Sequence, residues 1–438
     1  MIANLFTILF FLAGSWKIID LIYVFQIKEY RMDRFVAAVH DEGIVHIFLT
    51  PRKFPAKSVR NILIVSFSFT LLGLYCWLVR DSIIGAFVSL LLSPLLGFLF
   101  VLLGVVATSL LAYVKREAII KKASRLLSES KTTVIGITGS YGKTTAKEYL
   151  YTILGTKFKV AKTDENMNSD VGVAISLLKN LRPDTQYFIA EMGAYRVGEI
   201  KKICGFVKPT YGIITAVGNQ HLALFGSRQH ILDTKMELLE SLPAHGCGWV
   251  NADSLSKGQI SRRVKSSLIF YKNNSEPLLG ITPCILLAEK LGIKREVIQD
   301  AVVNIKRKTT RAVPVPGMKQ SIIIDNSYNT SVEGCINMIR ILGQRKEKRR
   351  MLVTRGIIEL GIEKRASYDR ILRTLSRFHV SLYTTDADFN LLHPHWVHWF
   401  STESQLSEAL SKELGKNTVI AFEGRYNKDF IKSLIANN

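Results

Sequence analysis

The longest apolar runs of this chain all lie before residue 115, and they restrict how that part can fold. No charged residue interrupts the runs Ile62–Val79 and Ile83–Val114, and Ile2–Ile27 carries only two charges. About 20 apolar residues cross a bilayer as a helix, and backbone groups inside a bilayer must be hydrogen-bonded within that helix. The runs predict about three transmembrane helices in residues 1–120, the last with an interfacial or kinked extension. Helices buried in a soluble core are the alternative interpretation.

A glycine-rich turn connects a predicted strand to a predicted helix. The apolar run Val134–Ile137 is typical of a buried strand, and Ala146–Leu154 of the helix that follows. The turn between them contains Gly139, Ser140, Tyr141, Gly142, Lys143, Thr144 and Thr145. In such a turn the backbone N–H groups point at an anion, the lysine reaches the β- and γ-phosphates, and the next threonine hydroxyl joins a Mg²⁺ shell. The turn predicts ATP or GTP binding; a turn that binds nothing is the alternative.

Basic residues exceed acidic ones, giving a net charge of +22, and they flank the apolar runs. Those between the first two runs and those after the third are Lys28, Arg31, Arg34, Arg52, Lys53, Lys57 and Arg60, then Lys115, Arg116, Lys121, Lys122 and Arg125. The positive-inside rule places both segments in the cytoplasm. Three spans then leave the N-terminus outside and the glycine-rich turn in the compartment that holds ATP. Two spans within Ile83–Val114 would put that turn outside.

Charge and cysteine content also bear on partners. A positive surface beside the membrane suits anionic lipid or an acidic substrate. Nucleic acid is a competing interpretation, but no RNA- or DNA-binding motif is present, so we expect no nucleic-acid partner. The five cysteines have no CxxC spacing and predict neither a zinc site nor disulfides. Lys17 and Asp20, three residues apart in the first run, share a helix face and can pair.

From about residue 130 onward, short apolar strands alternate with helical stretches, which is typical of an α/β fold with a mainly parallel sheet. The strands expected in the first part are Val134–Ile137, Tyr187–Glu191, Tyr211–Val217 and Gly248–Val250. The second part has expected strands at Ile322–Asp325, Arg350–Thr354, Val380–Thr384 and Thr418–Phe422, and helices at Ser331–Leu342 and Arg365–Phe378. We therefore divide the chain into a membrane domain (1–120), a central ATP-binding domain (121–310) and a smaller dinucleotide-fold-like C-terminal domain (311–438).

Polar side chains with metal-binding or catalytic chemistry follow the expected strands of the central domain. Glu191 closes one strand, His221 follows another, and Lys235 lies on a predicted helix. The carboxyl ends of parallel strands are where open α/β sheets bind ligands, and a carboxylate and an imidazole there can hold Mg²⁺ for phosphoryl transfer. Taken singly, each residue also has a structural interpretation: a helix-cap carboxylate, a loop histidine and a solvated lysine.

These motifs, with several others, occur in the order and spacing of one enzyme family. The set comprises Gly139-x-x-Gly142-Lys143-Thr144-Thr145, Asn166-x-Asn168-Ser169-Asp170-Val171-Gly172, Glu191-Met192-Gly193, Gly218-x-x-His221-Leu222-x-x-Phe225-Gly226-Ser227, Lys235-x-Glu237, Asn251-Ala252-Asp253 and Asp325-Asn326-Ser327-Tyr328-Asn329. From about residue 130 onward the chain resembles the Mur ligases, most closely those that add D-alanyl-D-alanine. Such enzymes are ATP-dependent amide ligases in cell-wall peptidoglycan synthesis, in which a substrate carboxylate becomes an acyl phosphate and an amine then displaces phosphate.

The resemblance assigns roles to individual positions. It implies that Lys143 and Thr144 contact the phosphates and a first Mg²⁺, and that Glu191 binds that metal. It implies a second Mg²⁺ on His221 and a carbamylated, metal-binding Lys235. Asn168 would lie beside the γ-phosphate, the turn residues Gly139, Ser140, Gly142 and Thr145 would hold the nucleotide, and the C-terminal domain would close over it with Arg311, Asp325, Tyr328 and Asn329.

The sequence also departs from the family pattern. The usual Asp-Asp-x-Tyr-Asn-Ala-Asn-Pro motif is changed after Asp325, and little of the usual β-rich segment fits between Asp253 and Gly280. The His-Asn pair that the family places near the adenine does not follow Gly280. The apolar runs stand where the family has its UDP-binding domain.

Three functions remain open at this stage. The first is a membrane-anchored ligase of the Mur type in the cytoplasmic membrane, multi-pass, with cytoplasmic catalytic domains, whose partners are membrane lipid, a carboxylate-bearing acceptor and an amino acid or peptide donor. The second is a polyglutamate-type ligase with the same central fold. The third is an ATP-binding membrane scaffold without ligase activity. The acceptor, on the first interpretation, is lipid-linked or membrane-associated.

Overall fold

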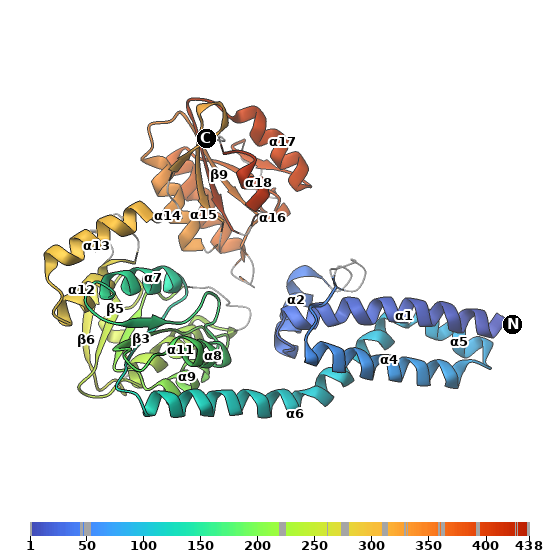
Figure 1. Cartoon of the computed structure of the whole chain (residues 1–438). Coiled ribbons are helices and arrows are strands. Elements are labelled where there is room, and N and C mark those ends of the chain that lie inside the picture. The colour runs from blue at the N-terminus through green and yellow to red at the C-terminus, as the bar shows by residue number, and fades with distance from the viewer. Residues whose placement is uncertain are drawn as a thin grey trace. The chain divides into compact units, whose positions relative to one another are not determined.

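The computed structural model describes residues 2–43, 47, 54–218, 225–260, 262–272, 280–308, 314–327, 330, 332–357, 360, 364–390, 395–424, 426 and 428–435. The chain divides into two compact units, Met1–Lys121 and Lys122–Asn438. Figure 1 shows the first unit as a bundle of helices and the second as two α/β layered parts. The boundaries that we expect between the membrane, central and C-terminal domains, at residues 120 and 310, stay predictions.

The first unit is built from helices α1 (Ile2–Ile27), α2 (Met32–Glu42), α4 (Val59–Val79), α5 (Ile83–Leu91) and the start of α6 (Ser93–Ser128). α1 packs on α4 and α5. α1, α4 and α6 are each long and apolar enough to cross a membrane, judged by length and composition. The uncharged run Ile83–Val114 therefore consists of the short helix α5 followed by the first part of the long helix α6, and the break between them lies beside Ser93. A kinked extension of the third span was expected in this run.

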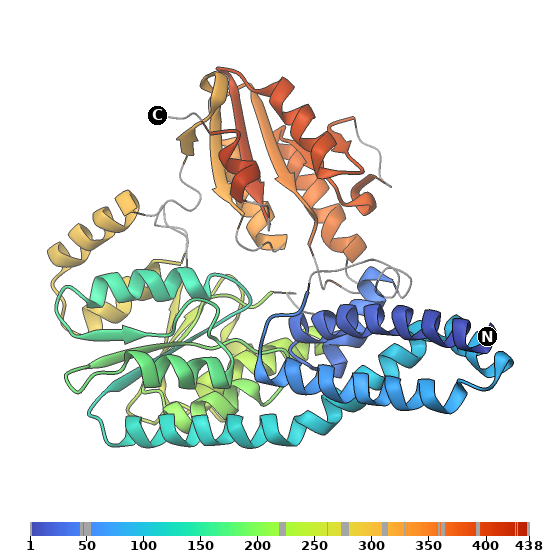
Figure 2. The ribbon, with the colours of Figure 1, turned by 45° about the vertical axis from the view of Figure 1, so that its right-hand side comes forward.

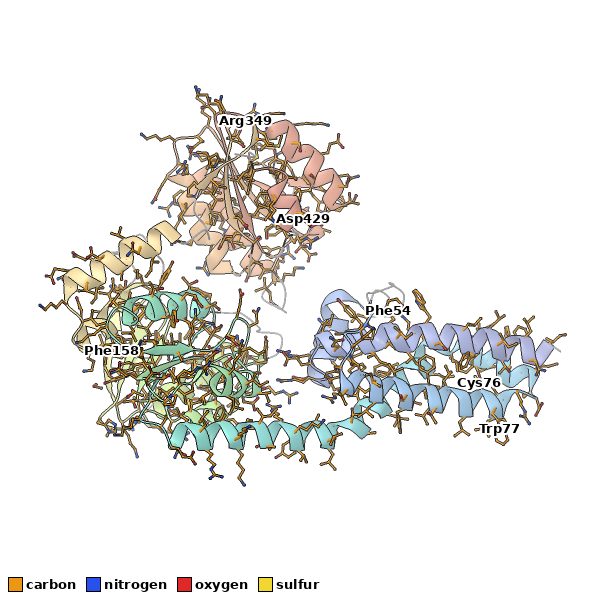
Figure 3. The ribbon with its side chains drawn as sticks, viewed as in Figure 1. Phe54, Cys76, Trp77, Phe158, Arg349 and Asp429 are labelled. Carbon is orange, nitrogen blue, oxygen red and sulfur yellow. The ribbon has the colours of Figure 1, made fainter. Side chains whose placement is uncertain are left out.

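The helix surfaces of this unit differ from those of a soluble bundle. Trp77 and Leu110 are exposed although they are large and apolar. Figure 3 shows Trp77 directed away from the bundle, whereas its neighbour Cys76 is buried. Lys17 and Asp20 form the expected pair, 2.7 Å apart and buried. Large apolar side chains are thus exposed in this unit while a charged pair is buried.

The central sheet has six strands in the order β2-β3-β1-β4-β5-β6, and all its pairings are parallel. The strands are β1 (Thr133–Thr138), β2 (Val160–Lys162), β3 (Tyr187–Glu191), β4 (Tyr211–Ile214), β5 (Cys247–Asn251) and β6 (Ser267–Tyr271). Helices α7 (Lys143–Leu154), α12 (Thr282–Lys290) and α13 (Arg295–Lys308) share one apolar core with the sheet. Helices α8 (Asp170–Asn180), α9 (Glu199–Val207) and α11 (Arg228–Glu240) pack together, and Figure 1 shows α9 and α11 on the side of the sheet opposite α7.

The second sheet has the order β11-β10-β9-β12-β8-β7, parallel except for β7. Its strands are β7 (Pro314–Pro316), β8 (Ile322–Asn326), β9 (Arg349–Thr354), β10 (Ser381–Thr384), β11 (Val397–Trp399) and β12 (Thr418–Glu423). α14 (Val332–Gly343) and α15 (Lys364–Phe378) share one core with the sheet, and α17 (Glu403–Glu413) and α18 (Lys428–Lys432) contribute to another. Figure 2 gives a second view of these strands running side by side. The predicted α/β class with mainly parallel sheets is confirmed.

Four of the strands were not expected from sequence, and one expected strand is shorter than predicted. β2, β7 and β11 have three residues each, too few for a periodic signal, and β6 is only partly buried. The strand expected over Tyr211–Val217 ends at Ile214. The N–H of Thr215, the next residue, still donates to the carbonyl oxygen of Thr138 at the end of β1. All five cysteines are buried and free.

Candidate nucleotide and ligase site

The glycine-rich turn has the backbone geometry of a phosphate-binding loop. β1 ends at Thr138 and α7 begins at Lys143 after Gly142, whose φ is 81°. Gly139 has a φ of 151°, and a Cβ atom placed on it would lie 2.1 Å from Thr215 Oγ1. No side-chain hydrogen bond caps the N-terminus of α7. The first N–H groups of α7 are therefore available to an anion, and only glycine fits at position 139.

The loop is fastened to the chain that follows β4. Thr215 donates its hydroxyl to the carbonyl oxygen of Tyr141. The hydroxyl of Ser140 donates to the carbonyl of Gly218 and accepts the N–H of Gly218, both at 3.0 Å. The loop is thus held open in one shape before any nucleotide binds, which lowers the entropic cost of binding. Thr215 was missed in the sequence because it lay inside the overlong strand.

Lys143 lies at the first position of α7 and folds back over the loop. Its Nζ donates to the carbonyl oxygen of Gly139 at 2.8 Å. Desolvation lowers the pKa of Lys143, while the charge of Glu191 acts in the opposite direction. An ammonium held only by loop carbonyls can turn to a phosphate, which is a stronger acceptor because it is charged.

Three neighbouring side chains contact the carboxylate of Glu191, which lies at the end of β3. Thr144 donates its hydroxyl to Oε1 at 3.0 Å, and Asn168 donates its amide to the same oxygen at 3.2 Å. The ammonium of Lys147 lies 3.0 Å from Oε2 as an ion pair, without hydrogen-bond geometry. The structure therefore brings together Thr144, Asn168 and Glu191, which the sequence had placed at three separate motifs.

Glycine at position 193 permits this arrangement. A Cβ atom there would lie 2.8 Å from Oδ1 of Asn168. The N–H of Gly193 donates to the backbone carbonyl of Asn168 at 2.8 Å, fixing the asparagine beside the strand end. Position 193 thus sets how closely the asparagine approaches Glu191.

The charge of Glu191 is stabilised although the residue is only 2% exposed. Burial alone would raise the pKa of Glu191, but the charges of Lys147 and Lys143 and the hydrogen bond from Asn168 outweigh it, and the net pKa is lowered. A buried, ionised carboxylate beside a threonine hydroxyl is the hard oxygen-donor chemistry that Mg²⁺ takes. These two side chains fit a magnesium ion at a phosphate.

Lys147 was not predicted as a site residue. It lies one turn after Lys143 on α7, so both lysines share a helix face, and its side chain is 0% exposed. The available sequence signal was that Lys147 follows Lys143 by four residues, which places both on one face of the helix. A lysine in a helix, however, usually faces solvent.

Lys235, on α11, is 4% exposed, and its Nζ lies 5.7 Å from the centroid of the Phe225 ring. Burial, together with the positive charge of Lys143, lowers the pKa of Lys235 to about 7 against the opposing effect of Glu237 and Glu199. Lys235 therefore belongs to the same electrostatic environment as the phosphate loop.

A row of glycines lets α11 approach the sheet closely. Gly136, Gly212 and Gly248 are in register on the adjacent strands β1, β4 and β5. A Cβ atom on Gly136 would lie 2.7 Å from Leu238, and one on Gly248 would lie 2.7 Å from Leu239. The leucines of α11 occupy this space, so the glycine row sets the height at which α11 presents its side chains.

Glu237, two residues after Lys235, has a structural role. Its carboxylate accepts the N–H of Gly198 and the N–H of Lys201 at 2.8 Å, at the start of α9. Burial raises the pKa of Glu237 despite these hydrogen bonds. The carboxylate caps the N-terminus of α9 and connects α9 to α11, which explains the glutamate of the Lys235-x-Glu237 motif.

Of the remaining residues that we predicted for the site, some lie in the part of the chain that the structure describes and others do not. Asp325 is at the end of β8, where its Oδ1 accepts the N–H of Ser327 at 2.9 Å. Thr145 follows Thr144 on α7. His221, Arg311, Tyr328 and Asn329 lie outside the described residues. Within the described part of the chain, no three His, Cys, Asp or Glu side chains are grouped to hold a metal.

Comparison with known proteins relates this part of the chain to one family. Residues 137–290 match the Mur ligase middle domain family. The UDP-N-acetylmuramoyl-tripeptide--D-alanyl-D-alanine ligase of Synechocystis sp. is 30% identical over 255 residues, which are 52% of this chain and 56% of the relative. The enzyme of that name from Bacillus subtilis is 36% identical over 124 residues, 28% of this chain and 27% of the relative. The chain thus spans little more than half the length of the first of these curated relatives.

Solved structures show the same fold. MurF from Acinetobacter baumannii superposes with a TM-score of 0.64 at 22% identity, covering 72% of this chain and 78% of that chain. MurF ligase from Thermotoga maritima in complex with ADP gives 0.63 at 21% identity, covering 73% and 82%. FolC from E. coli in complex with DHPP and ADP gives 0.51 at 12% identity, covering 71% and 89%.

The phosphate loop, the strand-end carboxylate and the family match together point to one class: residues 137–290 are similar to the Mur ligase middle domain. Within that class, the chain is similar to MurF, the UDP-N-acetylmuramoyl-tripeptide:D-alanyl-D-alanine ligase, in both sequence and fold. The resemblance read from the motifs is confirmed.

Proposed function

We propose that this protein is a membrane-anchored, ATP-dependent amide ligase of the Mur type that acts in peptidoglycan synthesis. The observation that carries the proposal is the cluster around Glu191, where Thr144 and Asn168 meet one carboxylate beside an open phosphate loop. The position of Glu191 at a strand end, the charge of Lys143 and the N-terminus of α7 all suit the binding of a nucleoside triphosphate.

The chain's own residues supply most of the chemistry of the first step. A substrate carboxylate attacks the γ-phosphate of ATP, and an acyl phosphate and ADP result. The N–H groups at the start of α7 and the ammonium of Lys143 stabilise the negative charge on the phosphates. Mg²⁺, held by Thr144 and Glu191, would neutralise charge that develops on the phosphate oxygens. Lys147 keeps Glu191 ionised for that purpose.

In the second step an amine attacks the acyl phosphate and phosphate leaves. The resemblance assigns Lys235 a carbamate, which requires a neutral amine in a dry position. Its burial among apolar side chains of α11 and the ring of Phe225 supports this assignment. The carbamate would turn a cation into an anionic ligand, and His221 would provide a further ligand.

The membrane anchoring rests on α1, α4 and α6. The basic residues that flank them predict the N-terminus outside and residues 115–438 in the cytoplasm. Single cysteines at Asp81→Cys and Ser130→Cys test this orientation with an impermeant thiol reagent on whole cells. We expect labelling at 81 and none at 130 before lysis, with little background because the native cysteines are buried. Labelling at 130 with protection at 81 would reverse the topology.

The acceptor is, on this proposal, held at the membrane. Lys115, Arg116, Lys121 and Lys122 follow the third span and would attract a pyrophosphate or lipid head group. The alternative is that these charges only set topology. Ligation rates of the full chain on lipid-linked and UDP-linked precursors, compared at equal concentration, separate the two. Equal use of both would contradict a membrane-held acceptor.

The ligase proposal itself is tested by ADP release from purified full chain with pooled envelope precursors. We expect turnover that depends on both an acceptor and an amine donor, and its loss in Lys143→Ala. Glutamate-dependent turnover alone would favour the polyglutamate-type ligase. Nucleotide binding without turnover would favour the scaffold.

A further inference from the structure

A groove with an unusual concentration of arginines lies between α14 and α15. It has a volume of 510 Å³ and is lined by Arg340, Ala366, Asp369, Arg370, Arg373, Thr374, Arg377 and Phe378. This volume is within the range of small-molecule sites, roughly 300–1,000 Å³. Four of the eight lining side chains are arginines and only one is an acid.

The helix geometry explains how these arginines gather. Arg370, Arg373 and Arg377 are spaced by three and four residues on α15, so they form one stripe with Cβ atoms about 5–6 Å apart. Arg340, in the last turn of α14, joins them because α14 packs along α15. The apolar faces of both helices are buried in the sheet core, so the stripe is left at the surface.

The groove arginines differ in their ion pairing from other positively charged side chains around the second sheet. Arg349 pairs with Glu413 at 2.9 Å, Arg345 pairs with Glu347 at 2.7 Å, and Lys412 pairs with Glu408 at 2.7 Å. Within the described part of the chain, by contrast, Arg340, Arg373 and Arg377 form no ion pair; the guanidinium of Arg377 lies only over the ring of Phe378, at 5.7 Å.

Like charges placed this close repel one another unless an anion lies between them. Folding of α14 and α15 does not require arginine at the exposed positions, since lysine, glutamate or glutamine would favour the helix equally well. Arginine differs from these residues in its planar fork, which binds phosphate oxygens through two parallel hydrogen bonds. A concentration of arginines therefore indicates an anion with several oxygen acceptors.

We propose that the α14–α15 groove binds a compact phosphate-bearing anion. Arg340, Arg373 and Arg377 hold the phosphate oxygens. Such an anion has two sources for a chain with membrane-spanning helices: the head groups of anionic lipids, or a soluble phosphate. This site is separate from the proposed ligase reaction, and its occupation does not depend on turnover.

Calorimetric titration of inorganic pyrophosphate into the full chain tests the proposal. The protein is kept in an uncharged detergent, and each titration is repeated with Lys143→Ala added, which weakens phosphate binding at the nucleotide site and leaves the groove unchanged. We expect Arg373→Gln combined with Arg377→Gln to weaken pyrophosphate binding at least tenfold. The matched control combines Arg349→Gln with Lys412→Gln, which removes the same charge from paired side chains outside the groove and should bind within twofold of the unmodified chain. Figure 3 labels Arg349.

A second arm identifies the source of the phosphates. The same titrations are run in nanodiscs of phosphatidylcholine with and without phosphatidylglycerol. Weaker pyrophosphate binding in the anionic discs, shared by the control and absent from the groove variant, assigns the groove to lipid head groups; no change assigns it to a soluble phosphate. Equal affinity of the groove and control variants, or no binding by the unmodified chain, would overturn the proposal.

Discussion

Replacing Lys147 by methionine removes the ammonium that pairs with Glu191 while it keeps an unbranched side chain in the core. Lys147 is 0% exposed and Glu191 is 2% exposed, so water cannot replace the lost partner. Removing one member of a buried ion pair costs about 3–5 kcal/mol of unfolding free energy, because the other charge remains buried and unpaired. At about 2–4 °C per kcal/mol for a domain of 150–250 residues, Tm of this domain should fall by about 6–20 °C.

The loss should depend on pH in a defined direction. In the unmodified chain the pKa of Glu191 is lowered by Lys147 and Lys143 against the effect of burial. Glu191 therefore contributes stability above its unfolded pKa, near 4.5, and loses it as pH falls through the folded pKa. Without Lys147, burial raises the pKa of Glu191 relative to the unmodified chain. The deficit of Lys147→Met should be larger at pH 7 than below pH 4.5, where Glu191 can be protonated.

Differential scanning calorimetry of the full chain in detergent measures the effect. Lys179→Met is the matched control, since Lys179 pairs with Asp164 at 2.8 Å but is 67% exposed and should lose less than about 1 kcal/mol. Adding Glu191→Gln to Lys147→Met should restore most of the stability, because no unpaired charge remains. A Lys147→Met chain as stable as the Lys179→Met control would refute the reasoning.

Three further predictions concern the reaction and the C-terminal sheet. Lys143→Ala and Thr144→Ala should each lower ADP release by about 10²–10³-fold if electrostatic stabilisation of the phosphates dominates; turnover near that of the unmodified chain would remove the phosphate loop from the mechanism. Lys235→Ala should be inactive but partly rescued by short carboxylic acids that replace the carbamate, and full activity without them would exclude a carbamylated lysine. Burial raises the pKa of Glu423 to about 8, and the residue is 1% exposed. Because its folded pKa exceeds its unfolded value, stability falls as pH rises from about 4.5 to 8, by up to about 1.4 kcal/mol per pH unit. Glu423→Gln should flatten this fall in thermal unfolding, and an unchanged pH profile would contradict it.

The strand–turn–helix at the nucleotide site was predictable because its parts are local. An apolar strand, glycines at the turn and a helix that begins at Lys143 are each visible within a few residues. β3 was predicted over Tyr187–Glu191, as found, because its short apolar run ends at a charged residue. The placement of Glu191 at a strand end followed from the same pattern, Thr144 followed from the glycine-rich turn, and Asn168 came from the resemblance.

The parts that were missed depend on contacts between distant segments. Thr215 was assigned to a strand because nothing local shows that its hydroxyl bonds the loop 74 residues earlier. Lys147 was missed because burial of a lysine is set by Glu191, which lies on another strand. Gly136, Gly212 and Gly248 are unremarkable singly and matter only once the register places them in one row under α11.

The C-terminal sheet shows the same limit. Its central strands were predicted from apolar runs, but β7 and β11 are too short to produce a pattern. Glu423 ends β12 as an ordinary acid in the sequence, and its raised pKa follows from burial beside Asn326, which lies 97 residues earlier. The arginine groove likewise requires α14 and α15 to be packed side by side.

The central claim is most directly tested by product formation with isotopic transfer. Purified full chain is given ATP, D-alanyl-D-alanine and a UDP-linked or lipid-linked muramoyl tripeptide whose terminal carboxylate carries ¹⁸O. The account predicts one amide product per ADP released, detected by mass spectrometry, with ¹⁸O recovered in the released phosphate because the carboxylate oxygen attacks the γ-phosphate. ADP release without an amide product, or phosphate free of ¹⁸O, would contradict the account.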